Sequence, residues 1–152
     1  MSDISQTALR KTATKDAIDQ FVMAAQITAD QSTAPYRDML ESLVDSAPVP
    51  TGFQSAKQAS DKASAAAYIA QKLAAAAGGK ISDDTPSKAE VSWAVNVVQE
   101  QGDLRPETAA TLKQELSLPE PVELPSDQMA ALVTAATSRV SGLGGSPAAI
   151  SR

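Results

Sequence analysis

The sequence predicts an all-α protein: an irregular bundle of about six helices, with a proline-rich extended connector before the last helix and irregular terminal arms. Three observations lead to this prediction. Apolar residues recur at the three- and four-residue spacing of a helix along most of the chain. Proline and glycine fall between these segments, where they end helices and form turns. No stretch alternates apolar and polar residues convincingly enough to indicate a strand.

The N-terminal third of the chain predicts two helices. The first begins near Thr7 or near Thr14, and its apolar face consists of Ile18, Phe21, Val22, Ala25 and Ala29. Pro35 suits the first turn of a helix, where its missing N–H is not needed, so a second, short helix is expected to begin there. Its apolar face consists of Tyr36, Met39, Leu40, Leu43 and Val44. Pro48 and Pro50 end this helix in the loop SAPVPTG.

The third predicted helix, residues 55–77, is rich in alanine. A capping box that starts at Thr51 or Ser55 begins it, and a Gly-Gly pair ends it. Residues 56, 59, 63, 66, 70, 73 and 77 follow the spacing of a heptad repeat, and all except Leu73 are alanine. We call these positions the alanine seam.

The alanine seam has two interpretations. Alanine is abundant here and forms helices well, so the spacing could arise by accident. Alternatively, the seam packs tightly against another helix, within the subunit or between subunits, because small side chains let helix axes approach closely. The candidate contact residues are Ala59, Ala63, Ala66, Ala70 and Leu73.

Two further features predict contact surfaces. Tyr68 lies on the polar side of the third helix, where it is either a lone exposed aromatic residue or the anchor of an interface. The segment SLPEPVELP, residues 117–125, reads as an extended and semi-rigid connector because its prolines are spaced through acidic residues. Its candidate interface residues are Pro119, Pro121, Val122 and Leu124.

The later helices complete the predicted organisation. A fourth helix begins near Thr85 and Pro86 and ends at Gly102, a fifth begins at Pro106, and the last follows a cap at Ser126. We therefore expect a helical bundle in residues 1–116, the connector in 117–125, a C-terminal helix in 126–143 and a tail in 144–152. The C-terminal helix is expected to pack on the bundle or on a neighbouring subunit.

Composition restricts the function. The chain has no histidine, the commonest general base, and no cysteine nucleophile, and no catalytic, cofactor-binding or metal-binding motif is found. The net charge of −5 disfavours broad binding to nucleic acid or anionic membranes. No uncharged apolar stretch is long enough to span a bilayer, and the N-terminus lacks the apolar region of a signal peptide. Neither a small-molecule substrate nor a cofactor is expected.

The resulting expectation is a non-enzymatic structural or assembly protein that contacts other copies of itself and other assembly proteins. Small helical virion components, such as phage head–tail adaptors or connectors, share this profile of helical corners, extended arms and no active site. On this analogy the location is a virion or the cytoplasm, and residues 117–125 and the termini reach between subunits.

The alternative is a small DNA-binding or DNA-packaging accessory protein. Residues 91–116 have the order helix, glycine turn and helix, which is that of a helix-turn-helix motif. A recognition helix must present side chains to bases and phosphates. The second helix offers Arg105 and Lys113, but Glu107 and Glu115 make the local charge unfavourable, so a structural corner is the preferred interpretation.

Overall fold

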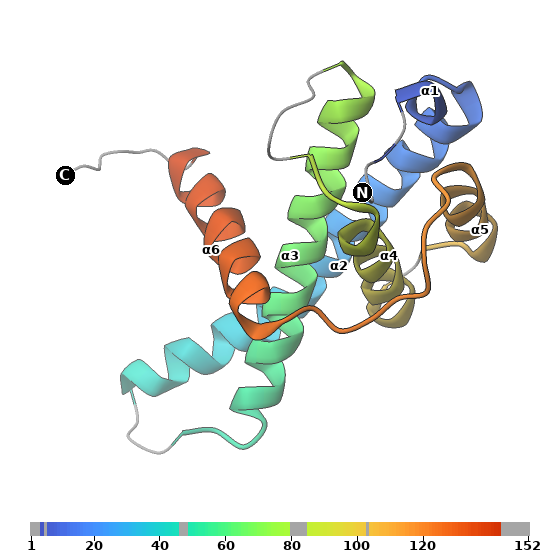
Figure 1. Ribbon diagram of the computed structural model, residues 1–152. Helices are drawn as coiled ribbons and strands as arrows, with labels where there is room; N and C mark the ends of the chain where they lie inside the picture. Colours follow the sequence, from blue (N-terminus) through green and yellow to red (C-terminus); the bar gives the residue numbers. More distant parts are fainter. Residues whose placement is uncertain (1–3, 5, 46–48, 80–84, 103, 144–152) are drawn as a thin grey trace.

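The computed structural model describes residue 4 and residues 6–45, 49–79, 85–102 and 104–143. This part of the chain is helical and contains no strand, which confirms the all-α prediction. Its six helices are α1 (Gln6–Leu9), α2 (Thr12–Asp45), α3 (Phe53–Ala77), α4 (Lys88–Gln101), α5 (Pro106–Glu115) and α6 (Ser126–Leu143) (Figure 1). The predicted tail, residues 144–152, lies outside the described residues.

The two longest helices, α2 and α3, form an antiparallel hairpin that organises the fold (Figure 1). Tyr36 of α2 lies opposite Phe53 of α3, with ring centroids 5.4 Å apart. Further along the hairpin, the hydroxyls of Thr33 and Ser60 are 3.3 Å apart. The remaining helices pack around the opposite half of this hairpin, so the core lies at one end of it.

α3 is the central helix because it contacts α2, α4 and α6 at once. Its middle turns are therefore buried on nearly every side, including the consecutive residues Ala65, Ala66 and Ala67. Larger side chains would keep three surrounding helices apart, whereas alanine lets them approach. Alanine gives α3 little apolar surface of its own. For the same reason, it allows α3 to lie at the centre of the bundle.

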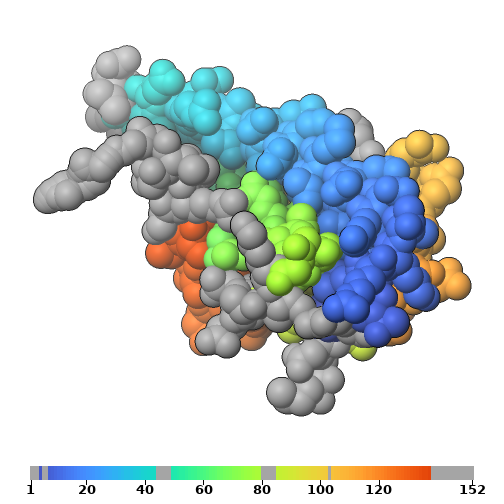
Figure 2. All heavy atoms as spheres, turned by 90° about the horizontal axis from the view of Figure 1, so that it is seen from above, coloured from blue at the N-terminus to red at the C-terminus, as the bar shows by residue number. Residues whose placement is uncertain are grey.

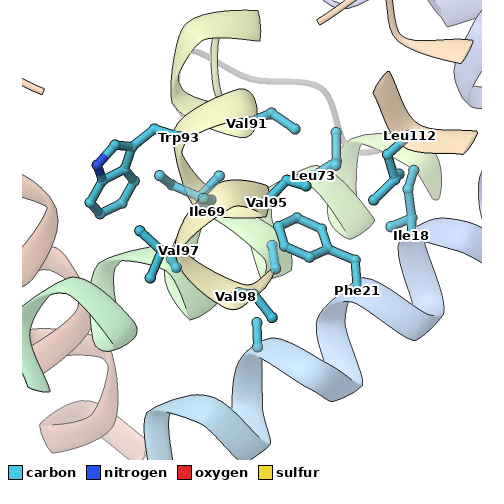
Figure 3. Close-up of a cluster of buried hydrophobic side chains, with 14 of the residues drawn as sticks. Ile18, Phe21, Ile69, Leu73, Val91, Trp93, Val95, Val97, Val98 and Leu112 are labelled. Carbon is cyan, nitrogen blue, oxygen red and sulfur yellow. The ribbon is translucent and has the colours of Figure 1, made fainter. Parts of the chain in front are cut away.

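The larger core side chains come mainly from the helices around α3. Phe21 of α2 points toward Val95 and Val98 of α4 (Figure 3). Leu112 of α5 closes the same cluster beside Ile18. All of these side chains are buried. α5 packs more extensively on α2 than on α4, and the Thr108 hydroxyl donates a hydrogen bond of 2.6 Å to the Gln20 side-chain oxygen.

The prediction of a separate short helix from Pro35 is wrong. Pro35 lies inside α2, which runs without a break from Thr12 to Asp45. A proline here removes the donor for the carbonyl of Gln31, and such a loss usually ends or kinks a helix. The contacts of Tyr36 and Thr33 with α3 lie directly beside Pro35, and this packing on α3 offsets the missing hydrogen bond.

Helix starts differ from the predictions in two places. α3 begins at Phe53, after Gly52 in the left-handed conformation (φ 84°), and no side chain caps it, so neither predicted capping box forms there. α4 begins two residues later than Pro86, at Lys88. Its cap is Ser87, whose hydroxyl accepts the backbone N–H of Glu90 while the Glu90 carboxylate accepts that of Ser87. The predicted starts at Pro106 and near Ser126 agree with the structure.

The connector lies along the bundle. Just before it, α5 ends in a Schellman-type turn, in which Leu118 N–H donates to the Lys113 carbonyl at 3.0 Å. Ser117 occupies the left-handed position of that turn with φ 53°. The Ser92 hydroxyl of α4 then donates to the carbonyl of Pro119 at 2.6 Å. These bonds hold the connector against α4 and lead it to α6, which packs on α3 of the same subunit (Figure 1).

Candidate functional site

The alanine seam packs within the subunit. Ala63, Ala66, Ala70 and Leu73 are fully buried, with exposed fractions of 0%, and Ala59 is half-buried. The seam lies in the part of α3 that contacts α2 and α4. Of the two locations that the sequence left open, these four residues take the one inside the chain, and how tightly they pack stays a prediction. The four buried residues do not reach the surface of the subunit.

Tyr68 is half-buried and packs against the hydrophobic core. The Lys72 ammonium lies 5.6 Å from the centre of its ring, which is the distance of a cation–π contact. The ring is therefore not a lone exposed aromatic residue. Its role as an anchor between subunits stays a prediction from the sequence.

The connector residues differ in exposure. Pro119 is exposed, Val122 is 60% exposed, and Pro121 and Leu124 are half-buried. Leu124 packs against the core and also forms part of an open groove between α3 and α6, with a volume of about 630 Å³. Met129 and Val133 of α6 give the groove an apolar wall, and its other lining residues are Lys57, Gln58, Asp61, Lys62, Glu123, Ser126, Ala130 and Thr134.

A second surface is the end of the α2–α3 hairpin that projects beyond the core, at the lower left of Figure 1. We call this part, residues 34–45 and 49–59, the hairpin arm. In the space-filling view its α2 portion extends in cyan to the upper left, away from the blue N-terminal half of the same helix (Figure 2). Among the side chains described in the hairpin arm, none is fully buried.

The hairpin arm nevertheless carries large apolar side chains. Leu40 and Val49 are 39% and 63% exposed. Four more are half-buried, namely Tyr36, Met39, Leu43 and Phe53. The Tyr36–Phe53 ring contact and the approach of Met39 to Gly52 hold its two helices together. It is therefore a structured surface on which the apolar residues are only partly covered.

Charged side chains on this surface form few internal pairs. Lys57 contacts Asp61 one turn further along α3 at 2.8 Å. This hydrogen bond, together with the charge of the carboxylate, raises the pKa of the Lys57 ammonium. Exposed pairs of this kind contribute little to stability. The pair lies on the protein surface and lines the groove between α3 and α6.

No family model, curated protein or solved structure matches this chain. The structure itself therefore supplies the arguments about function. Within the described ranges, no group of acidic side chains is arranged to hold a metal ion. In the same part of the chain, no helix is both long enough and apolar enough to cross a membrane.

The helix-turn-helix region forms a corner of the bundle. α5 buries Thr108, Ala109 and Leu112 and exposes Arg105 and Lys113. An acidic residue also faces solvent here: the guanidinium of Arg105 lies 4.0 Å from the carboxylate of Glu107. The carboxylate of Glu115 pairs with Lys11 at 3.0 Å. This arrangement adds no argument for a nucleic-acid interface, so DNA binding stays a prediction from the sequence.

The hairpin arm is not among the candidate surfaces that the sequence predicts. The apolar stripe that begins at Tyr36 predicts the buried face of a short helix, whereas in the structure it is only partly covered. The signal for a projecting hairpin is the loop SAPVPTG between two strongly helical segments, because a short loop joins antiparallel neighbours. Which end of the hairpin the other helices cover depends on tertiary packing, which the sequence pattern does not reveal.

Proposed function

We propose that this protein is a non-enzymatic assembly component that binds other copies of itself and other assembly proteins through the hairpin arm. The observation that carries this proposal is the partly exposed apolar surface of that arm. A helix pair that served only to support the fold would turn its apolar residues into the core. Here Leu40 and Val49 face solvent at the end of the molecule furthest from the core.

The energetic argument is that contact with a partner would remove this apolar surface from water. Complete burial of a large apolar side chain contributes roughly 1.5–3 kcal/mol, and the partly covered residues of the hairpin arm retain a fraction of that. Six such side chains lie within one short hairpin. An apolar patch surrounded by polar residues is typical of a protein–protein contact.

The more specific form of the proposal is a virion component such as a phage head–tail adaptor, which would act in a virion or in the cytoplasm where virions assemble. It is supported by the class of structure: a small helical bundle, a projecting arm and an extended connector with the exposed residues Pro119 and Val122. Electron microscopy of the purified protein would test it, since rings or shells are expected.

The general proposal is tested by measuring the mass of the native particle by light scattering over a wide concentration range. The parent protein is expected to form multi-copy species, and Leu40→Glu is expected to shift them toward the monomer because a charge would be buried in the contact. Met23→Glu is the matched control, because Met23 is 64% exposed on the same helix outside the hairpin arm. A parent protein that stays monomeric at every concentration would refute self-assembly.

A further inference from the structure

We propose that the partner of the hairpin arm is the hairpin arm of a second copy, and that the two arms pair about a two-fold axis with α2 of one copy against α3 of the other. This inference rests on the proposed function, because it specifies the contact by which the copies assemble. Paired in this way, the two arms would form a short four-helix bundle.

The apolar residues of the hairpin arm support pairing with a similar hairpin. Two helices alone bury only the stripe between them, and Tyr36 and Phe53 accordingly remain half-buried although their rings are in contact. A second hairpin laid across this stripe would provide the missing layer, as in four-helix bundles. Met39 and Leu43 continue the same apolar face at helical spacing, so the surface is as long as the arm itself.

The distribution of charge on the hairpin arm favours a second copy as its partner and indicates how the two arms are oriented. Residues 34–45 contain Arg37, Asp38, Glu41 and Asp45, which give the α2 segment a net charge of −2. Residues 49–59 contain one charged residue, Lys57, which gives the α3 segment of the arm a net charge of +1. α2 against α3 of the partner copy therefore brings opposite charges together, whereas α2 against α2 brings two acidic segments together.

The symmetry of this pairing has a geometric consequence. Two hairpins that lie face to face with α2 over α3 are related by an axis parallel to their helices. Both loops then lie at the same end of the four-helix bundle. In the α2-over-α2 arrangement the axis is perpendicular to the helices and the two loops lie at opposite ends. The distance between them is then about the length of the arm, roughly 18 Å for the twelve residues 34–45.

The first test uses charge reversal and sedimentation equilibrium. Glu41→Lys and Lys57→Glu are each expected to raise the dimer dissociation constant about tenfold, and the double variant is expected to return it close to the parent value. Glu107→Lys, a charge reversal on the exposed part of α5, is the control and should leave association unchanged. Stronger association of Glu41→Lys would show that acidic segments face each other, and it would overturn the proposed orientation.

The second test uses the absence of cysteine from the chain, so that a single introduced thiol is unique. Val49→Cys lies beside the loop of the hairpin arm and is 63% exposed in the parent protein. We expect a reagent that joins two thiols over a distance shorter than the arm to link the two copies. Glu107→Cys on α5 should give no linked dimer.

The outcomes separate this inference from the proposed function. If the protein forms multi-copy particles whose association is unchanged by both charge reversals, and Val49→Cys gives no cross-linked dimer, arm pairing is overturned. Assembly would then use another surface. A protein that is monomeric at every concentration would overturn both.

Discussion

Gly102, which directly follows α4, lies against Thr28 of α2, and its substitution by alanine should destabilise the protein. A Cβ atom at this position would clash with Oγ1 of Thr28, and it would lie 3.1 Å from Cβ of Thr28 and 3.0 Å from the carbonyl oxygen of Val98. Thr28 is fully buried, and its hydroxyl donates to the Ala24 carbonyl at 2.8 Å, so the side chain has little freedom to move aside. α4 and α2 must separate instead.

The expected loss of stability is that caused by one additional methyl group in a packed core. Such overpacking typically destabilises by about 1–3 kcal/mol. We expect Gly102→Ala to lie in the upper half of that range, because its closest contact is far inside van der Waals distance. For a chain of this length each kcal/mol lowers Tm by about 2–4 °C.

A double-mutant cycle separates this clash from other effects. Thr28→Ala removes the oxygen that lies nearest to the new methyl group, and alone it costs about 1 kcal/mol through the lost hydrogen bond and methyl contact. Combined with Gly102→Ala it should destabilise by at least about 1 kcal/mol less than the sum of the two single variants. Urea unfolding followed by circular dichroism measures all three free energies of unfolding.

Gly78→Ala is the control for glycine replacement as such. The added Cβ would meet no atom closer than 3.5 Å, and the backbone φ of −83° suits alanine, so the change should be within about 0.5 kcal/mol of zero. If Gly102→Ala is equally mild, or if its effect and that of Thr28→Ala simply add, the close approach of α4 to α2 is not as described.

Three further substitutions test the alanine seam, a buried hydroxyl and the turn after α5. Ala70→Leu should destabilise by about 2 kcal/mol or more because Ala70 is fully buried in the alanine seam, and unchanged thermal stability would refute tight packing there. Thr14→Val should be neutral or stabilise by about 1 kcal/mol, because the buried Thr14 hydroxyl has no hydrogen-bond partner among the described residues; marked destabilisation in urea would reveal one. Ser117→Gly should stabilise by up to about 1 kcal/mol, since glycine adopts the positive φ without strain, and a lower Tm would contradict this account of the turn.

Helical periodicity was sufficient to predict the fold class and most of the helices. The apolar face that includes Ile18 and Phe21 is buried as expected, and Pro106 and the Gly-Gly pair after residue 77 mark the boundaries predicted for them. These features are local, because they depend on residues within a turn or two of one another. The Ser87–Glu90 capping box is an equally local signal, and it places the start of α4 two residues later than Pro86.

The errors have a tertiary cause. Pro35 ends a helix when only local hydrogen bonding is considered, but packing of its neighbours on α3 keeps α2 continuous. The burial of consecutive alanines in α3 likewise depends on how many helices surround it, and no periodicity within α3 specifies that number. The hairpin arm was missed for the same reason, since its apolar stripe resembles that of a buried helix.

The continuity of α2 determines how neighbouring copies would be oriented in an assembly. One helix of 34 residues, about 50 Å long, runs from the core into the hairpin arm with no linker between them. The direction of the arm is therefore fixed by the same packing that places Phe21 and Thr28 in the core. The angle between two copies joined through their arms would be built into each subunit before they meet, and a core substitution that tilts α2 would change the angle between the two copies of the dimer.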